Sequence, residues 1–159
     1  MVDYAEHMVE SYLKSERRTF IQPQSYIDIE ANGQRVEFYP DALALNLSES
    51  TLFVCEVKIS VEETPVSAAK AMLKAVGRYE AYWDLIGDHF RRKIGVPAGF
   101  LMRSWLFLPE KSAEILVPQL GVVTRPRITP LEMCAAWRYR NWDRIGEKDK
   151  PAFLAEFAG

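Results

Sequence analysis

The sequence predicts one α/β domain, a mixed sheet flanked by helices, spanning residues 1–159. Segments with an apolar residue every three or four positions, typical of helices, alternate with short runs rich in β-branched and aromatic residues, typical of strands. Hydrophobic residues make up 48% of the chain and charged residues 26%, which is a globular composition. No linker, repeat or low-complexity segment divides the chain.

The first helix is expected from Asp3 to about Arg17. Asp3 and Glu6 have the spacing of a capping box, in which side chains satisfy the free N–H groups at a helix start. The positions that follow form one apolar face at helical spacing: Ala5, Met8, Val9, Tyr12 and Leu13.

Three consecutive antiparallel strands are expected over residues 26–59. The first two, 26–31 and 35–45, flank Asn32-Gly33, a pair favoured in tight hairpins because both residues tolerate positive φ. A turn at 47–50 leads into the third strand, 51–59, which is rich in β-branched and aromatic residues.

A long helix is expected to start near Thr64, with Pro65 in its first turn, and to continue to about residue 92 before Gly95 breaks it. The strand at 100–108 is almost continuously apolar, which predicts an interior position in the sheet.

The C-terminal part is expected to contain a short helix at 111–120, a strand at 122–128 and a last helix. Thr129, Pro130 and Glu132 have the spacing of a capping box with proline at the first helical position, and this predicts a helix through about Trp142.

Composition excludes several classes of protein. Lys and Arg total 20 against 22 Asp and Glu, a net charge of -2, so a protein that coats nucleic acid through excess cations is excluded. No apolar run is long enough to span a membrane, and the acidic N-terminus is unlike a signal peptide. Cys55 and Cys134 lie in apolar patterns and are expected to be small buried hydrophobes. We expect a cytoplasmic protein with no membrane partner.

Charged residues gather at the end of one predicted strand. Glu56 and Lys58 are two apart, so they project from the same face, and Asp41 is expected on the neighbouring antiparallel strand beside Glu56. Two adjacent carboxylates repel, and a divalent cation is the simplest relief. The alternative is a solvated strand end with a surface salt bridge.

The combination of Pro40-Asp41, fourteen intervening residues and Glu56-Val57-Lys58 resembles the PD-(D/E)xK nuclease superfamily. The family's restriction-endonuclease-like core, in the order helix, three strands, helix, strand, matches residues 3–108 and leaves 109–159 as a C-terminal extension. Three further segments resemble TnsA-type endonuclease subunits of transposons and related phage nucleases: Ile21-Gln22-Pro23, Asn32-Gly33 and Tyr39-Pro40-Asp41.

The resemblance implies Mg²⁺-dependent hydrolysis of DNA phosphodiester bonds, with Mn²⁺ able to substitute. Asp41 and Glu56 would hold the metal, and Lys58 would position the attacking water. Glu6 on the first helix would be a further ligand, with Glu10 one turn later as the alternative. Glu6 is equally explained as a capping carboxylate favoured by the helix dipole.

Two basic regions are candidates for contact with DNA. Lys70, Lys74 and Arg78 form a stripe on the long helix, which is equally an ordinary solvated face. Residues 137–144 interleave aromatics with arginines, and we favour a core or dimer-interface role over base stacking.

Two functional hypotheses follow. The first is a metal-dependent DNA endonuclease, the catalytic subunit of a mobile-element, phage or defence/repair system, which acts with a DNA-targeting protein partner or as a homodimer. The second is a catalytically silent nuclease-like fold that binds nucleic acid or assembles with proteins.

Overall fold

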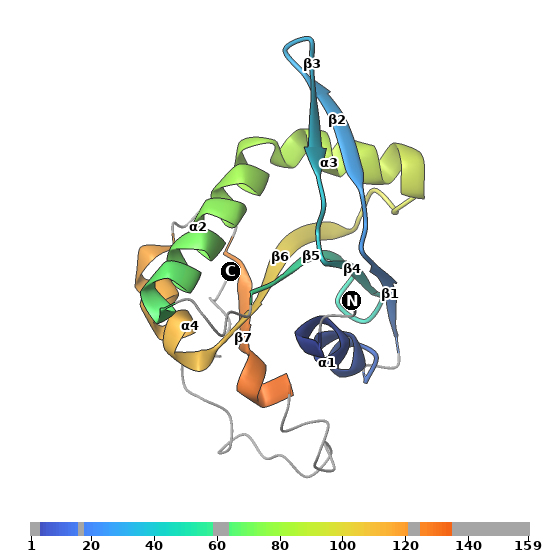
Figure 1. The fold of residues 1–159 in the computed structure, drawn as a ribbon. Helices are drawn as coiled ribbons and strands as arrows, with labels where there is room; N and C mark the ends of the chain where they lie inside the picture. The colour runs from blue at the N-terminus through green and yellow to red at the C-terminus, as the bar shows by residue number, and fades with distance from the viewer. Residues whose placement is uncertain (1–3, 16–17, 59–63, 121–124, 135–159) are drawn as a thin grey trace.

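The computed structural model describes residues 4–15, 18–58, 64–120 and 125–134, so the prediction for residues 137–144 lies outside it. Its centre is a five-stranded mixed sheet in the order β1-β4-β5-β6-β7, accompanied by a separate β2-β3 hairpin (Figure 1). The strands are β1 Thr19–Pro23, β2 Ile27–Ala31, β3 Gln34–Phe38, β4 Ala42–Asn46, β5 Thr51–Val57, β6 Leu101–Leu108 and β7 Arg127–Pro130. The α-helices are α1 Tyr4–Leu13, α2 Pro65–Ala81, α3 Trp83–His89 and α4 Glu110–Leu116, followed by shorter π and 3-10 turns at Phe90–Ile94 and Val117–Gln119.

The sheet is antiparallel on one side and parallel on the other. β4 pairs antiparallel with β1 and β5, whereas β6 pairs parallel with β5 and β7. The predicted interior position of β6 is therefore confirmed. The carboxyl ends of β5 and β6 meet at one edge of the sheet.

Helix α1 covers one face of the sheet. Met8, Val9 and Leu13 pack in one buried cluster with alternate residues of β5, Phe53 and Cys55. This is the apolar helical face predicted from the spacing, so the prediction is confirmed for the part of the helix that the structure describes.

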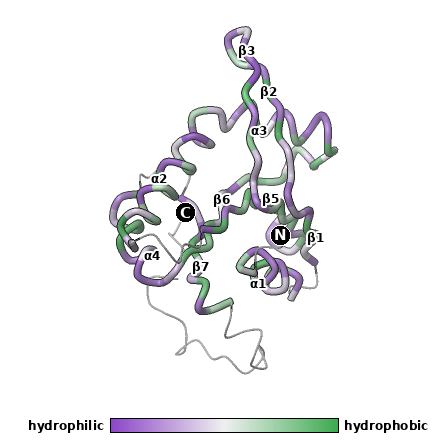
Figure 2. Tube along the Cα trace, viewed as in Figure 1, coloured by the Kyte–Doolittle hydropathy of each residue, from purple (hydrophilic) through white to green (hydrophobic). Residues whose placement is uncertain are grey.

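The opposite face is covered by the hairpin and by helices α2, α3 and α4. The intervening residues of β5, Leu52 and Val54, pack with Ile27 and Phe38 of the hairpin and Ile86 of α3. Farther along the sheet, residues of α2 and α4 pack on Leu106 and Leu108 of β6. Figure 2 shows the apolar residues concentrated in these inner strands, while the hairpin tip is mostly hydrophilic.

The expectation of three consecutive strands over 26–59 is wrong in its middle. The segment 35–45 is interrupted at Pro40, which lacks an N–H for a ladder and restricts the residue before it. β2 and β3 consequently form a hairpin separate from the sheet, and β1, a strand that was not predicted from the sequence, pairs with β4 instead. Gln24, at φ 49°, lies where the chain leaves β1 for the hairpin.

The predicted single helix from 64 to 92 is two helices. Thr64 caps α2 as expected, its hydroxyl accepting the Ser67 N–H at 3.2 Å. The helix then breaks at Tyr82, whose ring meets Phe38 edge-on at 5.9 Å. The following segment ends in the π turn, where Gly95 adopts a left-handed conformation at φ 75°.

The predicted capping box at 129–132 is also wrong. Thr129 and Pro130 belong to β7, and the Thr129 hydroxyl accepts the Trp105 indole N–H at 2.9 Å. The Glu132 carboxylate accepts the backbone N–H of Glu110, with N–O distances of 2.9 and 3.1 Å, and so caps α4. Residues 131–134 are helical, and the rest of that predicted helix lies outside the described residues.

Two smaller predictions also have an outcome. Cys55 and Cys134 are buried free thiols, as expected. Within the described ranges, no helix has the length and apolar character needed to cross a membrane.

Candidate active site

Asp41 and Glu56 lie side by side at the carboxyl end of β5. Ala42 is opposite Cys55 in the antiparallel register, which places Asp41 opposite Glu56. The Asp41 backbone N–H donates to the Cys55 carbonyl at 3.1 Å, and its own carbonyl accepts the Gln24 N–H at 2.8 Å. These bonds fix Asp41 against β5. Asp41 was expected within a continuous strand, but it lies between β3 and β4.

The Asp41 side chain is anchored to the same strand. Its Oδ2 accepts the backbone N–H of Val57 at 2.7 Å, so the carboxylate lies next to Glu56. One carboxylate of the pair therefore has a fixed position and a fixed partner.

Glu56 is held in a less favourable environment. Burial is the main reason that its pKa rises to about 8, and the negative charge of Asp41 adds to the rise. A hydrogen bond from the Tyr79 hydroxyl acts in the opposite direction, because it stabilises the charged form. Without a bound cation, the pair retains a proton near neutral pH.

Tyr79 lies at the candidate site, and its hydrogen bond to Glu56 was not predicted from the sequence. It lies on the buried face of α2 and stacks on Phe38 with ring centroids 5.4 Å apart. Burial, followed by the charge of Glu56, raises the pKa of the phenol, which therefore stays a donor. The available signal was a tyrosine on an apolar helix face, since a buried hydroxyl needs a polar partner.

Glu6 influences Glu56 through its charge. It lies on α1, and its negative charge contributes to the raised pKa of Glu56. Glu10 instead forms an ion pair with Lys14 at 4.0 Å, one turn further along. The part of Glu6 or Glu10 as a further metal ligand stays a prediction, because no three metal-ligating side chains cluster among the described residues.

Lys58 follows β5 directly and is half-buried. Its backbone N–H donates to the carbonyl of Phe107 at 2.8 Å, which extends the parallel pairing with β6 by one residue. The carboxyl ends of parallel strands are where α/β proteins commonly bind ligands. The part of Lys58 in positioning a water molecule stays a prediction.

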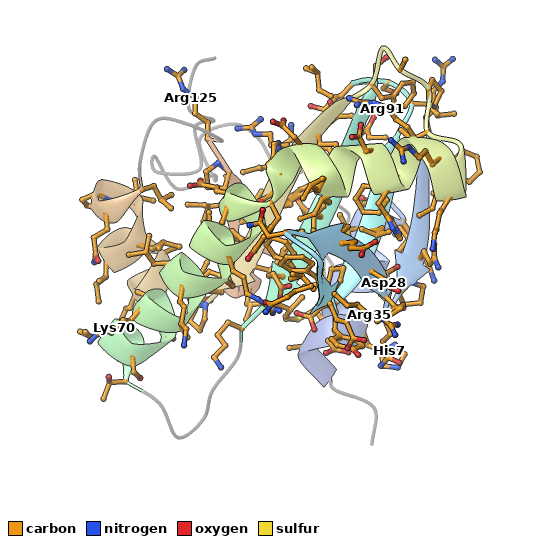
Figure 3. The ribbon with its side chains drawn as sticks, turned by 90° about the horizontal axis from the view of Figure 1, so that it is seen from above. His7, Asp28, Arg35, Lys70, Arg91 and Arg125 are labelled. Atoms are coloured by element: carbon orange, nitrogen blue, oxygen red, sulfur yellow. The ribbon has the colours of Figure 1, made fainter. Side chains whose placement is uncertain are left out.

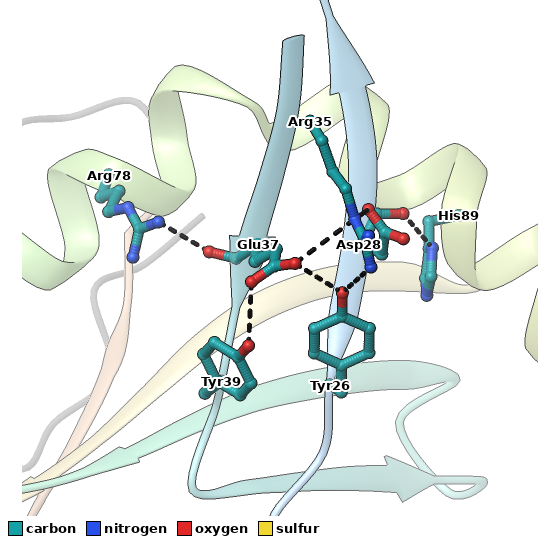
Figure 4. A network of polar contacts seen from close by, with 7 residues as sticks. All are labelled: Tyr26, Asp28, Arg35, Glu37, Tyr39, Arg78 and His89. Atoms are coloured by element: carbon teal, nitrogen blue, oxygen red, sulfur yellow. Dashed lines mark hydrogen bonds and ion pairs between the residues drawn. The ribbon is translucent and has the colours of Figure 1, made fainter.

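The basic stripe on α2 divides into two kinds of residue. Lys70 and Lys74 are exposed, and Figure 3 shows Lys70 far from the hairpin residues Asp28 and Arg35. Arg78 donates from Nη2 to the carbonyl of Glu37 at 2.6 Å (Figure 4). Its guanidinium also lies over the Phe38 ring, 4.6 Å from the ring centroid. Arg78 therefore has a structural task in holding the hairpin to α2, which the spacing alone did not indicate.

The donor set suits Mg²⁺ better than a metal that needs a complete protein cage. Over the described part of the chain, no three His, Cys, Asp or Glu side chains gather as a metal cluster. Mg²⁺ commonly binds through one or two carboxylates and keeps several waters, so Asp41 and Glu56 meet its requirement. A cation there would also relieve the repulsion that raises the pKa of Glu56.

Comparisons with known proteins give one structural resemblance. No protein-family model matches the chain, and no curated protein sequence matches it significantly. Among solved structures, the chain is similar to an XisH family protein from Nostoc punctiforme PCC 73102, with 17% identity and a TM-score of 0.43. The alignment covers 83% of this chain and 94% of that chain. Similarity at this level establishes no family, and the function is inferred from the site itself.

Proposed function

We propose that the protein is a metal-dependent endonuclease of the PD-(D/E)xK type that hydrolyses DNA phosphodiester bonds in the cytoplasm. The observation that supports this most directly is the half-buried Asp41–Glu56 pair at the end of β5, with Lys58 two residues beyond Glu56. A pair of carboxylates that repel each other is costly to bury unless a cation or proton joins them.

Asp41 and Glu56 would hold Mg²⁺, with Glu6 bound directly or through water and Mn²⁺ able to substitute. The bound ion supplies Lewis acidity toward the phosphoryl oxygen and toward water. The Val57 N–H orients the Asp41 carboxylate, and the Tyr79 hydroxyl orients that of Glu56. Lys58 would hold the attacking water and offset the charge that develops on the phosphate as the water oxygen forms a new P–O bond and the P–O bond to the leaving sugar oxygen breaks.

The net charge of -2 gives little electrostatic affinity for DNA. We therefore propose that the chain works with a DNA-targeting protein partner or as a homodimer, in a mobile-element, phage or defence/repair system. Lys70 and Lys74 would contact the phosphate backbone. The TnsA-like branch of the superfamily is the proposed affiliation.

The alternative is a catalytically silent module that binds nucleic acid or assembles with proteins. It is favoured by the slight excess of acidic residues, 22 against 20 basic ones, which suits a protein that does not act on DNA by itself. The two candidates differ in whether Asp41, Glu56 and Lys58 matter for a chemical step.

Nicking of supercoiled plasmid in Mg²⁺ or Mn²⁺ separates them. Asp41→Asn keeps an acceptor for the Val57 N–H and removes the charge, and Lys58→Ala removes the cation. Both variants should lose nicking, whereas Glu30→Gln, a carboxylate change on the exposed hairpin surface, should retain it. Equal nicking by the wild type and the three variants, or nicking that does not require a metal ion, would reject the catalytic proposal.

A further inference from the structure

The outer face of the β2-β3 hairpin presents two exposed tyrosine rings. Tyr26 and Tyr39 are 42% and 65% exposed, and their ring centroids are 5.2 Å apart with an interplanar angle of 43°. Large aromatic surfaces are usually buried, and exposed ones often mark interaction sites. The inner face of the same hairpin, with Ile27 and Phe38, is buried in the core and has no such surface.

The two rings are held in place by one carboxylate. Tyr26 donates to Glu37 Oε1 at 3.0 Å and Tyr39 donates to Glu37 Oε2 at 2.9 Å (Figure 4). Arg35 donates to the Tyr26 hydroxyl and to Asp28 Oδ1, the latter at 2.9 Å. The hydroxyls are thus engaged within the protein, and the ring faces are what a ligand can meet.

This tyrosine pair adjoins the candidate active site. Pro40 alone separates Tyr39 from Asp41, so their Cα atoms are at most about 7 Å apart along the chain. Phe38, the other neighbour of Tyr39, stacks on Tyr79, which donates to Glu56. The backbone therefore holds Tyr39 within two residues of Asp41, at the end of the hairpin nearest the candidate site.

The charged residues around the two tyrosines favour contact with an uncharged part of a ligand. Asp28 and Glu37 contribute two carboxylates, and Arg35 and Arg78 contribute two guanidinium groups, so the network has no excess of either charge. Such a surface has no excess of positive charge to select a phosphate, whereas an uncharged base stacks on aromatic faces without regard to sequence. In an intact duplex both faces of each base are already covered by neighbouring bases, so only an unpaired base can stack there.

We infer that Tyr26 and Tyr39 form a platform that stacks an unpaired base beside Asp41 and Glu56, and that the preferred substrate is DNA with unpaired nucleotides at the cleavage site. The identity of the ligand as DNA rests on the proposed function. Its test measures binding without cleavage, so the two proposals can fail separately.

The test uses the full chain in EDTA and oligonucleotides that contain 2-aminopurine, whose fluorescence is quenched when it stacks. One oligonucleotide places the probe in an unpaired flap and a matched one places it within a duplex. The wild type should quench the flap probe and bind the flap about ten-fold more tightly than the duplex. Tyr39→Leu should abolish the quenching and the preference, whereas Tyr39→Phe, which retains the ring, should keep both.

Phe20→Leu is the matched control, because it removes an exposed aromatic ring on β1, 63% exposed, outside the hairpin. It should behave as the wild type. Equal quenching by the wild type and Tyr39→Leu, or no preference for the flap, would overturn the inference. Binding of a methylated-lysine peptide that is lost in Tyr39→Leu, with no quenching of DNA, would overturn it as well and assign the rings to a cationic protein ligand.

Discussion

The carboxylate of Asp41 is bonded to the strand of its partner, because its Oδ2 accepts the backbone N–H of Val57 at 2.7 Å. That bond holds a fixed negative charge against Glu56 in a partly buried place. The protein therefore stabilises an arrangement that is unfavourable in the absence of a cation. Stability and metal binding should consequently be linked at this pair.

Glu56→Gln should stabilise the metal-free protein at high pH and have little effect at low pH. The pKa of Glu56 is raised from its ordinary 4.5 to about 8 in the folded state. The favourable contribution of its protonated form is complete below the unfolded pKa and is lost as the pH rises through the folded pKa. In EDTA, the melting temperature of Glu56→Gln should exceed that of the wild type at pH 9 and equal it at pH 5.

Glu30→Gln serves as the control for that experiment, because it neutralises an exposed carboxylate of the hairpin. It should shift the melting temperature by the same small amount at both pH values. A pH-independent effect of Glu56→Gln would contradict the raised pKa of Glu56 as the cause.

Tyr79→Phe should weaken metal binding while leaving the fold intact. The ring would still stack on Phe38, but Glu56 would lose the donor that stabilises its charged form. Loss of a group that orients a metal ligand typically lowers metal affinity by about 10- to 100-fold. Titration with Mn²⁺ by calorimetry should show this drop. Tyr82→Phe is the control, because it removes the hydroxyl of another tyrosine whose ring meets Phe38 edge-on. It should bind Mn²⁺ as the wild type does.

Arg78→Ala should lower the free energy of unfolding by about 1 kcal/mol, whereas Lys74→Ala should leave it unchanged. Arg78 joins α2 to the hairpin through the Glu37 carbonyl and the Phe38 ring. An exposed cation–π contact and a charged hydrogen bond are each worth about 1 kcal/mol or somewhat more before solvent screening. Urea unfolding of both variants measures the difference, and equal midpoints would show that Arg78 is only a surface charge.

Local signals predicted the elements whose cause is local. Asn32 and Gly33 both adopt positive φ, at 53° and 76°, as the hairpin prediction requires. Thr64 caps α2 for the same kind of reason. By contrast, β1 exists because β4 pairs with it across the 18 residues of chain from 24 to 41, and the break at Tyr82 accompanies a contact with Phe38 on the hairpin. Neither contact can be predicted from neighbouring residues, because each joins segments that are distant in the sequence.

The candidate site divides in the same way. The alternation of side chains along a strand and the turn at 47–50 were sufficient to predict that Asp41 and Glu56 are neighbours. Tyr79 could not be assigned to Glu56, because helical spacing identifies a buried face without identifying what that face meets. The catalytic, metal-binding and DNA-binding parts given to these residues remain predictions.

Arg127→Lys should destabilise the fold by about 2 kcal/mol without touching the candidate site. The Arg127 side chain is 13% exposed, bonds both oxygens of Glu49, and lies 4.6 Å from the ring centroids of Phe53 and Trp105. It therefore joins β7 to the turn before β5 and to the core. A lysine keeps the charge but can neither form the paired bonds nor stack as a plane.

Arg91→Lys is the matched control, because Arg91 is 49% exposed and makes one long contact with Asp88 at 3.4 Å. It should change the free energy of unfolding by less than about 0.5 kcal/mol, as surface substitutions usually do. Urea unfolding at pH 7 compares the two variants. Equal midpoints would mean that the charge of Arg127 suffices and that its planar, two-bond geometry contributes nothing, since both substitutions preserve the charge.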